Sequence, residues 1–317
     1  CFQLHATTLP SLRHSSVPAR MAWRKRPSVN RQWRMQTLSE TMKACESGRY
    51  VTGDEDGKVA VSFDVAALRA RAPCSVRYSL DTTPAMPSAE TEAGRCSVPV
   101  QVVRGDCLDA ALLLRAAGHS PLVLNMASDK RPGGGFVHGA GAQEENLFRR
   151  TSYHMHLCAA PTGLADSARL KYPLGEADAI YSPDVLVMRG RESAGYPWLP
   201  EPVSMAFIAL PGYRNPELAS PQRLAERMAQ GLMTKVELLI RIAVHHGHDA
   251  LVLSALGCGA FRNPPAHVAQ LFALQLKRSG VLDGATPIRR VVFAILEDHN
   301  SGKSHNPRGN VAPFADA

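Results

Sequence analysis

The chain has 317 residues, 45% of them hydrophobic and 20% charged, so it is long enough for one large domain or two small ones. Its seven cysteines form no Cys-x-x-Cys pair, which excludes a disulfide framework and a cysteine-rich zinc site. No apolar run approaches the roughly 18 residues that a membrane span requires, so we expect a soluble intracellular protein, cytoplasmic or nuclear, with reduced thiols.

The net charge of +8 is concentrated in an N-terminal arm that contains no acidic residue. An Arg-rich, Ser-containing arm is typical of a mitochondrial transit peptide, and its charge also suits nucleic acid or another polyanion. Pro and Ser interrupt any amphipathic pattern, and Met21 is an alternative start, so we expect residues 1–30 to be a disordered extension. Seven of the eight excess charges lie within residues 1–39, on Arg13, Arg20, Arg24, Lys25, Arg26, Arg31 and Arg34.

Helical spacing begins at residues 31–46, after which Val59, Val61, Phe63 and Val65 alternate as in a strand. We interpret residues 31–91 as an accessory layer on the main fold, with a flexible loop over residues 83–97. Apolar runs then predict strands at Val98–Val103, Leu122–Asn125, Val185–Met188, Val203–Leu210, Ala250–Leu256 and Arg290–Leu296. Helical periodicity occupies Leu108–Ala117, Glu144–Cys158, Arg223–His246 and Pro265–Lys277.

Continuous apolar strands that alternate with helices indicate a sheet covered on both faces. The predicted fold class is therefore α/β, a three-layer α/β/α sandwich with an N-terminal helical accessory region. We expect one domain over residues 31–300, followed by a polar, flexible tail at residues 301–317. No internal repeat is present in the sequence.

The most informative motif is the stretch 125–135, Asn-Met-Ala-Ser-Asp-Lys-Arg-Pro-Gly-Gly-Gly, followed by Gln143, Glu144 and Glu145. Consecutive glycines allow positive φ and let a ligand lie against bare backbone. They indicate a site for a bulky, phosphorylated ligand. Carboxylates repel phosphate, so the two glutamates must serve another part of it, such as sugar hydroxyls or a leaving oxygen. The combination indicates glycosyl chemistry on a nucleotide sugar.

A second glycine loop follows the predicted strand Ala250–Leu256. Ligands collect at the carboxyl ends of strands in open α/β sheets, and two glycine loops at one edge can hold a pyrophosphate with backbone N–H groups. The sequence has no Gly-Lys-Ser or Gly-Lys-Thr of a P-loop. Neither Gly139-Ala140-Gly141 nor Gly257-Cys258-Gly259 is followed by the third glycine of a dinucleotide fingerprint.

Three glycines followed by Gln-Glu-Glu resemble the motif of poly(ADP-ribose) glycohydrolases, and the flanking sequence resembles their microbial-type branch. The resemblance extends from about Arg31 to about Asn300. It implies a macrodomain-like fold with a mixed sheet, and reversal of ADP-ribosylation, as in the DNA damage response. Further motifs in the family's order are Glu40-Thr41, Gly48-Arg49-Tyr50, Gly105-Asp106-Cys107-Leu108-Asp109-Ala110-Ala111, Tyr181-Ser182-Pro183-Asp184-Val185 and Gly257-Cys258-Gly259-Ala260-Phe261.

The resemblance assigns the catalytic acid and base to Glu145. Glu144 is then expected to fix ribose hydroxyls, as is Asn125, and Gln143 to orient the glutamates or to pack its amide against the loop. The alternatives are solvated carboxylates that favour a helix N-terminus and a strand-end turn role for Asn125. Adjacent glutamates cannot flank one bond from opposite sides, so a single glutamate must both protonate the leaving group and activate water.

Asp106 precedes a predicted helix, so it can be the N-cap of that helix, with Asp109 as an alternative cap. The resemblance to macrodomains implies instead that Asp106 contacts the adenine amino group. Arg262 stands where the family more often has a small residue, which leaves detailed substrate placement open. Phe293 fits a core strand better than an adenine stack. The remaining expected substrate contacts are Gly133, Gly134 and Gly135 of the first loop, and Gly257, Cys258, Gly259, Ala260 and Phe261 of the second.

The leading prediction is a hydrolase that releases ADP-ribose from poly(ADP-ribose) ends, acting as a monomer without cofactor or metal. The spacing of His245, His246 and His248 matches no metal pattern, and no cysteine has a paired base. Two alternatives stay open: a hydrolase of single ADP-ribosyl groups on proteins, and a non-enzymatic ADP-ribose-binding module. The expected substrate is the polymer or ADP-ribosylated proteins, and the sequence leaves exo or internal cleavage open.

Overall fold

The computed structural model describes residues 31–53, 57–86, 96–158, 170–297, 300–303 and 306–317. The arm 1–30 and most of the expected loop 83–97 lie outside the described residues. The helices are α1 (Arg31–Ser47), α2 (Val65–Arg71), α3 (Cys107–Ala116), α4 (Gln143–Arg150), α5 (Tyr153–Leu157), α6 (Glu226–His245), α7 (Pro265–Arg278) and α8 (Val311–Asp316), with short 3₁₀ turns η1 (Ala72–Cys74), η2 (Phe136–His138) and η3 (Glu192–Ala194).

A seven-stranded mixed sheet has the order β3-β6-β7-β5-β10-β11-β4. Strands β7, β5, β10, β11 and β4 run parallel, whereas β3 and β6 are antiparallel to their neighbours. The strands are β1 (Arg49–Thr52), β2 (Val59–Ser62), β3 (Val76–Tyr78), β4 (Val100–Arg104), β5 (Pro121–Ala127), β6 (Ala179–Arg189), β7 (Trp198–Pro211), β8 (Leu218–Ser220), β9 (Arg223–Leu224), β10 (Ala250–Leu253) and β11 (Arg290–Ile295).

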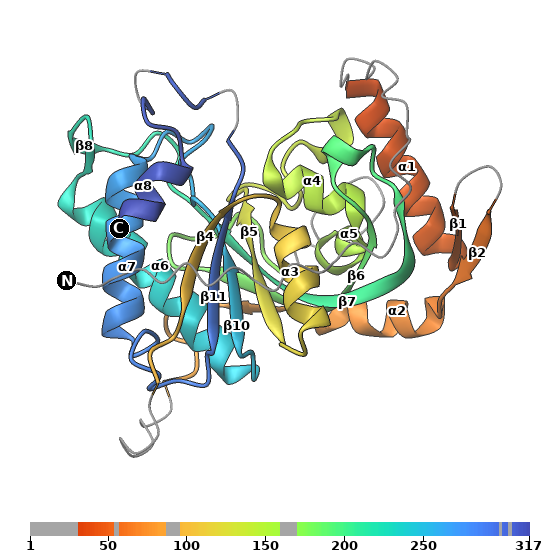
Figure 1. The fold of residues 1–317 in the computed structure, drawn as a ribbon, viewed down its shortest axis with the longest axis horizontal. Coiled ribbons are helices and arrows are strands. Elements are labelled where there is room, and N and C mark those ends of the chain that lie inside the picture. The colour runs from red at the N-terminus through yellow and green to blue at the C-terminus, as the bar shows by residue number, and fades with distance from the viewer. Residues whose placement is uncertain (1–30, 54–56, 87–95, 159–169, 298–299, 304–305) are drawn as a thin grey trace.

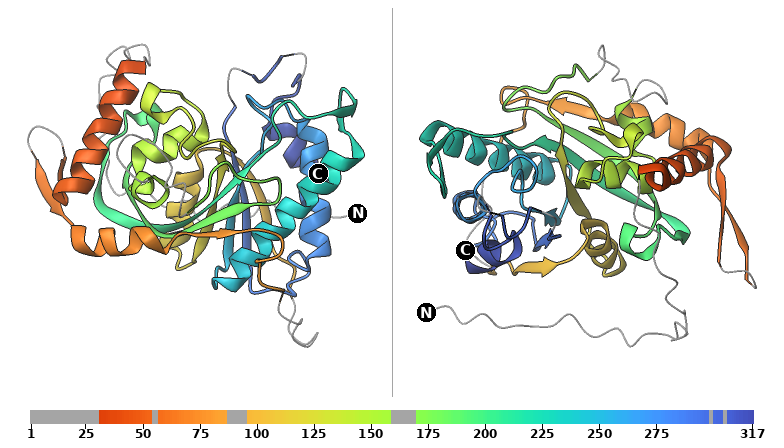
Figure 2. Two further views of the ribbon diagram at one scale, coloured as in Figure 1. Left: turned by 180° about the vertical axis from the view of Figure 1, so that it is seen from behind. Right: turned by 90° about the horizontal axis from the view of Figure 1, so that it is seen from above.

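Two hydrophobic cores lie on opposite faces of this sheet. Figure 1 shows α6, α7 and α8 on one side of the sheet and α3, α4 and α5 on the other. Along β5, Leu122 and Leu124 point into the core with α6, α7 and α8, whereas Val123 between them packs with α3, α4 and α5. Successive strand side chains point to opposite faces, so strands buried on both sides need apolar residues at every position. The three layers are visible edge-on in Figure 2, and they confirm the predicted sandwich.

The predicted helix Glu144–Cys158 is wrong in one respect, because it is two helices, α4 and α5. Between them Thr151 pairs with Val187 of β6, and the Ser152 N–H donates to the Leu186 carbonyl at 2.9 Å. The Ser152 hydroxyl in turn accepts the Leu186 N–H at 2.9 Å. These groups bond to the edge of the strand instead of continuing the helix, so the helix is interrupted there.

In the accessory region, the strand predicted from the alternation of residues 59–65 is shorter than expected. Strand β2 ends at Ser62 and pairs with β1 as a hairpin, and Val65 begins helix α2, capped by the Asp64 side chain on the Ala67 N–H. Strand β3, which the sequence did not predict, then joins the edge of the main sheet. The accessory region therefore contributes to the central sheet as well as covering it.

The expected flexible tail is also corrected, because its last residues form α8. Phe314 is 6% exposed and packs against Phe272 of α7 and Phe293 of β11. Phe293 is accordingly a core residue. In the same layer, the predicted helix 223–246 begins at Glu226, since Arg223 and Leu224 form β9 with β8. Among the described helices, none is long and apolar enough to cross a membrane.

Candidate active site

The first glycine loop follows β5 and is closed around the side chains of Glu144 and Glu145 in the first turn of α4. The Gly133 N–H donates to Glu144 Oε1 at 3.0 Å, and the Gly135 N–H donates to Glu145 Oε1 at 2.9 Å. Gly134, at φ +54°, has no room for a side chain: a Cβ there would lie 2.7 Å from Glu145 Oε1. Gly134 is thus required because the backbone touches the carboxylate there, whereas a Cβ on Gly133 would collide with the Phe136 and Phe148 rings.

Glu144 is 3% exposed, and both its oxygens accept hydrogen bonds within the protein. Oε2 accepts the Ser128 N–H at 2.7 Å, while Oε1 accepts the Gly133 N–H and, at 3.4 Å, the Asn125 amide. Burial raises the pKa of Glu144 to about 8, although these N–H donors oppose the shift. The described contacts make Glu144 a fixed support of the glycine loop, and the solvated alternative is excluded.

Glu145 differs from Glu144 in the hydrogen bonding of one carboxylate oxygen, Oε2. Its side chain is also buried, 8% exposed, and Oε1 is held by Gly135. Oε2 is buried and has no hydrogen-bond partner among the described residues. A buried oxygen of this kind is costly unless it serves a function or binds a ligand. Of the four oxygens of the pair, it is therefore the one without a partner among the described residues, and the contact of Glu144 with ribose hydroxyls stays a prediction.

Asn125 and Gln143 join β5 to α4. The Gln143 side chain accepts the Met126 N–H at 2.9 Å and donates to the Leu124 carbonyl at 2.7 Å, so it bonds to β5 as a strand neighbour would. Asn125 is fully buried within β5, and its Oδ1 has no partner among the described residues. Asn125 is therefore no exposed turn residue, and its ribose contact stays a prediction.

Asp106 is the N-cap of α3, which settles the choice against Asp109. Its Oδ1 accepts the N–H groups of Leu108 and Asp109 at 2.9 and 3.1 Å. Arg150 of α4 also donates to both carboxylate oxygens, at 2.8 and 2.7 Å. The cap that the sequence allowed is confirmed, and the ion pair ties α3 to the helix that carries the glutamates. An adenine contact by Asp106 stays a prediction.

The second loop, 254–264, is braced by a residue that the sequence reading did not single out. Asn263 donates from Nδ2 to the carbonyls of Tyr213 and Gly257, at 2.6 and 2.9 Å. Gly257 has φ +73°, and a Cβ there would lie 2.5 Å from Asn263 Nδ2. Asn263 therefore links the loops that follow β7 and β10.

Within this second loop Cys258 is fully buried, and burial raises the pKa of its thiol, so it is structural. Gly259 and Phe261 are half-buried and Ala260 is exposed. The Arg214 guanidinium lies 5.5 Å from the centre of the Phe261 ring. Arg262 is exposed at φ +62°, a conformation that favours small residues and glycine. The pyrophosphate role of the loop stays a prediction.

The sequence reading also missed two consecutive buried arginines, Arg149 and Arg150, which are both fully buried. Periodicity assigns charged residues to the solvent face, so no sequence signal identified them. Their partners come from distant segments, which only the fold brings together.

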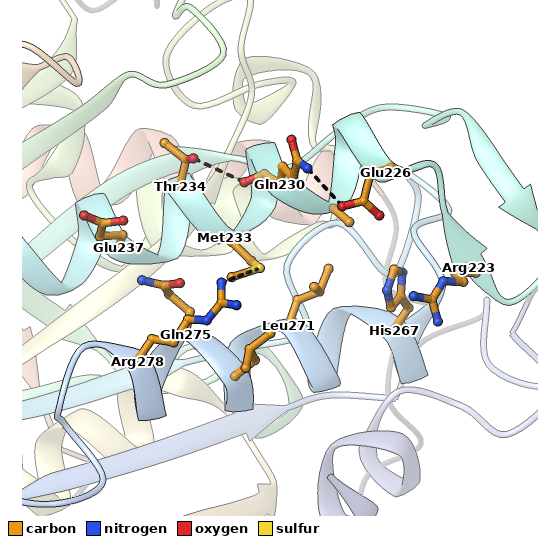
Figure 3. A pocket seen from close by; sticks show the side chains of 12 residues that line it. Arg223, Glu226, Gln230, Met233, Thr234, Glu237, His267, Leu271, Gln275 and Arg278 are labelled. Atoms are coloured by element: carbon orange, nitrogen blue, oxygen red, sulfur yellow. Dashed lines mark hydrogen bonds between the residues drawn. The ribbon is translucent and has the colours of Figure 1, made fainter.

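A groove of about 500 Å³ between α6 and α7 is separate from this site (Figure 3). It is lined by charges of both signs on helix surfaces, without a glycine loop or a buried unpaired oxygen. Its polar groups partly satisfy one another; Gln230 donates to Glu226 at 2.9 Å. The histidines at 246 and 248, which lie close together in the sequence, bond to different tyrosines. His246 bonds to Tyr78 and His248 bonds to Tyr181.

Comparison with known proteins identifies the family. The catalytic domain of microbial-type PARG matches residues 39–190, which include the first glycine loop and both glutamates. The crystal structure of poly(ADP-ribose) glycohydrolase (PARG) from Thermomonospora curvata is 32% identical, with a TM-score of 0.70, and the match covers 90% of this chain and 99% of that one. This chain belongs to the microbial-type PARG family.

Two further PARG structures contain ligands. The T. curvata enzyme bound to the inhibitor ADP-HPD matches with 32% identity and a TM-score of 0.66, over 90% of this chain and 99% of that one. PARG from Deinococcus radiodurans in complex with ADP-ribose matches with 25% identity and a TM-score of 0.61, over 80% and 98%. The comparison with curated proteins gives no match. The predicted family and the macrodomain-like fold are confirmed.

Proposed function

We propose that this PARG-family protein is a glycosidase that hydrolyses ribose–ribose O-glycosidic bonds of poly(ADP-ribose) and releases ADP-ribose, with Glu145 as general acid and base. The observation that carries the assignment is the unpartnered, buried Oε2 of Glu145, beside a Glu144 whose oxygens are both bonded to the protein. Family membership and the ADP-ribose bound in the D. radiodurans relative support the substrate class.

In the proposed reaction Glu145 donates a proton from Oε2 to the leaving ribose oxygen as the bond from that oxygen to the anomeric carbon breaks. The electron pair of this bond goes to the leaving oxygen, and positive charge develops at the anomeric carbon. A water oxygen then bonds to that carbon, and the Glu145 carboxylate accepts the proton released. The acid is thereby regenerated without a cofactor or metal.

The first glycine loop is expected to lie against the ribose and phosphates through Gly133, Gly134 and Gly135, with Asn125 at the ribose. Glu144 and Gln143 position this loop and α4. The second loop, Gly257, Cys258, Gly259, Ala260 and Phe261, is expected to receive the pyrophosphate through its backbone N–H groups. We propose that cleavage occurs at the ends of the polymer, the exo mode, because the PARG structure from D. radiodurans is in complex with a single ADP-ribose unit.

The test compares wild type and Glu145→Gln on poly(ADP-ribose) and on a mono-ADP-ribosylated protein, with chromatography of the products and calorimetry of ADP-ribose binding. We expect wild type alone to release ADP-ribose from the polymer, with a loss of at least about 100-fold in Glu145→Gln and a retained Kd. Release of oligomers as first products would overturn the exo mode. Release from the mono-modified protein would favour the first alternative, and binding without release a reader module.

A further inference from the structure

We infer that Glu192, in the connection between β6 and β7, is a positioning residue for the catalytic segment that leads into α4. This inference rests on the proposed role of Glu145. Glu192 lies in η3, far along the chain from the glutamates, and no motif in the sequence marks it.

The Glu192 carboxylate gathers donors from three parts of the fold. Oε1 accepts Arg34 Nε and Nη2 of α1 at 3.0 and 2.8 Å. Oε2 accepts the Tyr196 hydroxyl at 2.7 Å and Asn146 Nδ2 of α4 at 3.1 Å. The side chain is only 17% exposed, so these charge-assisted bonds are shielded from solvent.

Two arginines that contact Glu192 also donate hydrogen bonds to backbone carbonyls just before α4. Arg34 Nη1 donates to the Gly139 carbonyl at 3.3 Å, and Arg149 Nη1 donates to the Ala140 carbonyl at 2.7 Å. Arg149 has no exposed side-chain surface, and its Nη2 lies 3.7 Å from Glu192 Oε2. Its Nε donates to the Tyr196 hydroxyl at 2.8 Å, which itself bonds to Glu192. Glu192 thus sets the position of both donors.

The glycines in this segment fit the same arrangement. A Cβ on Gly141 would collide with the Arg34 guanidinium, and one on Gly139 would lie 2.5 Å from the Arg31 carbonyl oxygen of α1. The Gly139-Ala140-Gly141 stretch therefore admits the first turn of α1. The accessory helix is in this way bonded through Arg34 to the segment that joins the glycine loop to Glu144 and Glu145.

The consequence for catalysis is geometric. Glu145 Oε2 can protonate a leaving oxygen only when α4 and the loop that binds Oε1 hold their relative positions. A displacement of about 1 Å costs about 100-fold in rate. Loss of Glu192 releases the bonds to Arg34, Tyr196 and Asn146 at once, and leaves the buried Arg149 charge without its nearest carboxylate. We expect this release to move α4 without removing any substrate contact.

The experiment compares Glu192→Gln with Glu40→Gln. Glu40 pairs with the buried Arg189 at 2.7 Å, also between α1 and the core, but Arg189 donates to none of residues 139–146. We expect Glu192→Gln to lower kcat about 10- to 100-fold with KM and the Kd for ADP-ribose changed less than about threefold. Glu40→Gln should keep wild-type kcat even where it lowers the Tm as much.

Hydrogen exchange of residues 136–150 gives a readout independent of turnover. Glu192→Gln should speed exchange there relative to the rest of the chain, and Glu40→Gln should not. Adding Arg34→Met to Glu192→Gln should cause little further loss, because Arg34 reaches the Gly139 carbonyl from the position that Glu192 gives it. Equal effects of Glu192→Gln and Glu40→Gln on kcat and exchange would overturn the inference. A wild type that releases no ADP-ribose would instead refute the proposed function, and exchange would still decide the role of Glu192.

Discussion

Replacing Gly134 with alanine tests whether the glycine loop is built around the carboxylates of Glu144 and Glu145. The new Cβ would stand 2.7 Å from Glu145 Oε1, whereas ordinary contacts begin at 3.4 Å, so the oxygen must retreat by about 0.7 Å. Oε1 is held by the Gly135 N–H at 2.9 Å and cannot move that far without lengthening this bond. We expect kcat/KM for ADP-ribose release to fall about 100-fold.

Gly247→Ala is the matched control, because Gly247 also has positive φ, +71°, but has no atom within 4 Å of the position of a Cβ. Each variant should lose about 1 to 2 kcal/mol from left-handed backbone strain. Gly134→Ala should lose about 1 to 3 kcal/mol more, as a buried hydrogen bond is disturbed. Denaturant unfolding measures both. Equal losses of stability, together with unchanged kcat/KM in Gly134→Ala, would refute the reasoning.

Two other predictions concern stability. Burial raises the folded-state pKa of Glu144 from 4.5 to about 8, so its contribution is fully present below pH 4.5 and is lost as the pH rises through about 8. The unfolding free energy of wild type relative to Glu144→Gln should therefore fall between pH 5 and 9, by at most about 5 kcal/mol at about 1.4 kcal/mol per pKa unit; a rise would show that the N–H donors keep Glu144 ionised. Phe314→Ala should lower the unfolding free energy by about 3 to 5 kcal/mol, and an unchanged denaturation midpoint would mean that α8 does not hold the core.

Sequence patterns predicted the layers of the fold because β5, β10 and β11 carry runs of consecutive apolar residues. They also located the glutamates, since three glycines before paired carboxylates have few structural explanations. Side-chain roles within the pair were less accessible, because the different hydrogen bonds of Glu144 and Glu145 depend on how the loop closes. The role of Asp106 as a cap was among the predicted alternatives, but its partner Arg150 was not.

The missed elements have a common physical origin. Thr151 leaves the helix to pair with Val187, and Phe314 is ordered by an aromatic pocket on α7 and β11. Arg149 is buried because Tyr196 and Glu192 reach it from another segment. Each case is decided by a neighbour distant in sequence, which local periodicity does not report.

The three donors that bond to Glu144 have a thermodynamic consequence. The loop holds its shape through contacts within the protein, so the entropy of ordering it is lost when the chain folds and not when the polymer arrives. Under the proposed function, a loop preorganised in this way binds the ADP-ribose unit equally before and after the bond is cut. Such uniform binding contributes affinity but no acceleration, so the proposed mechanism assigns the acceleration to Glu145 Oε2, the oxygen without a partner among the described residues.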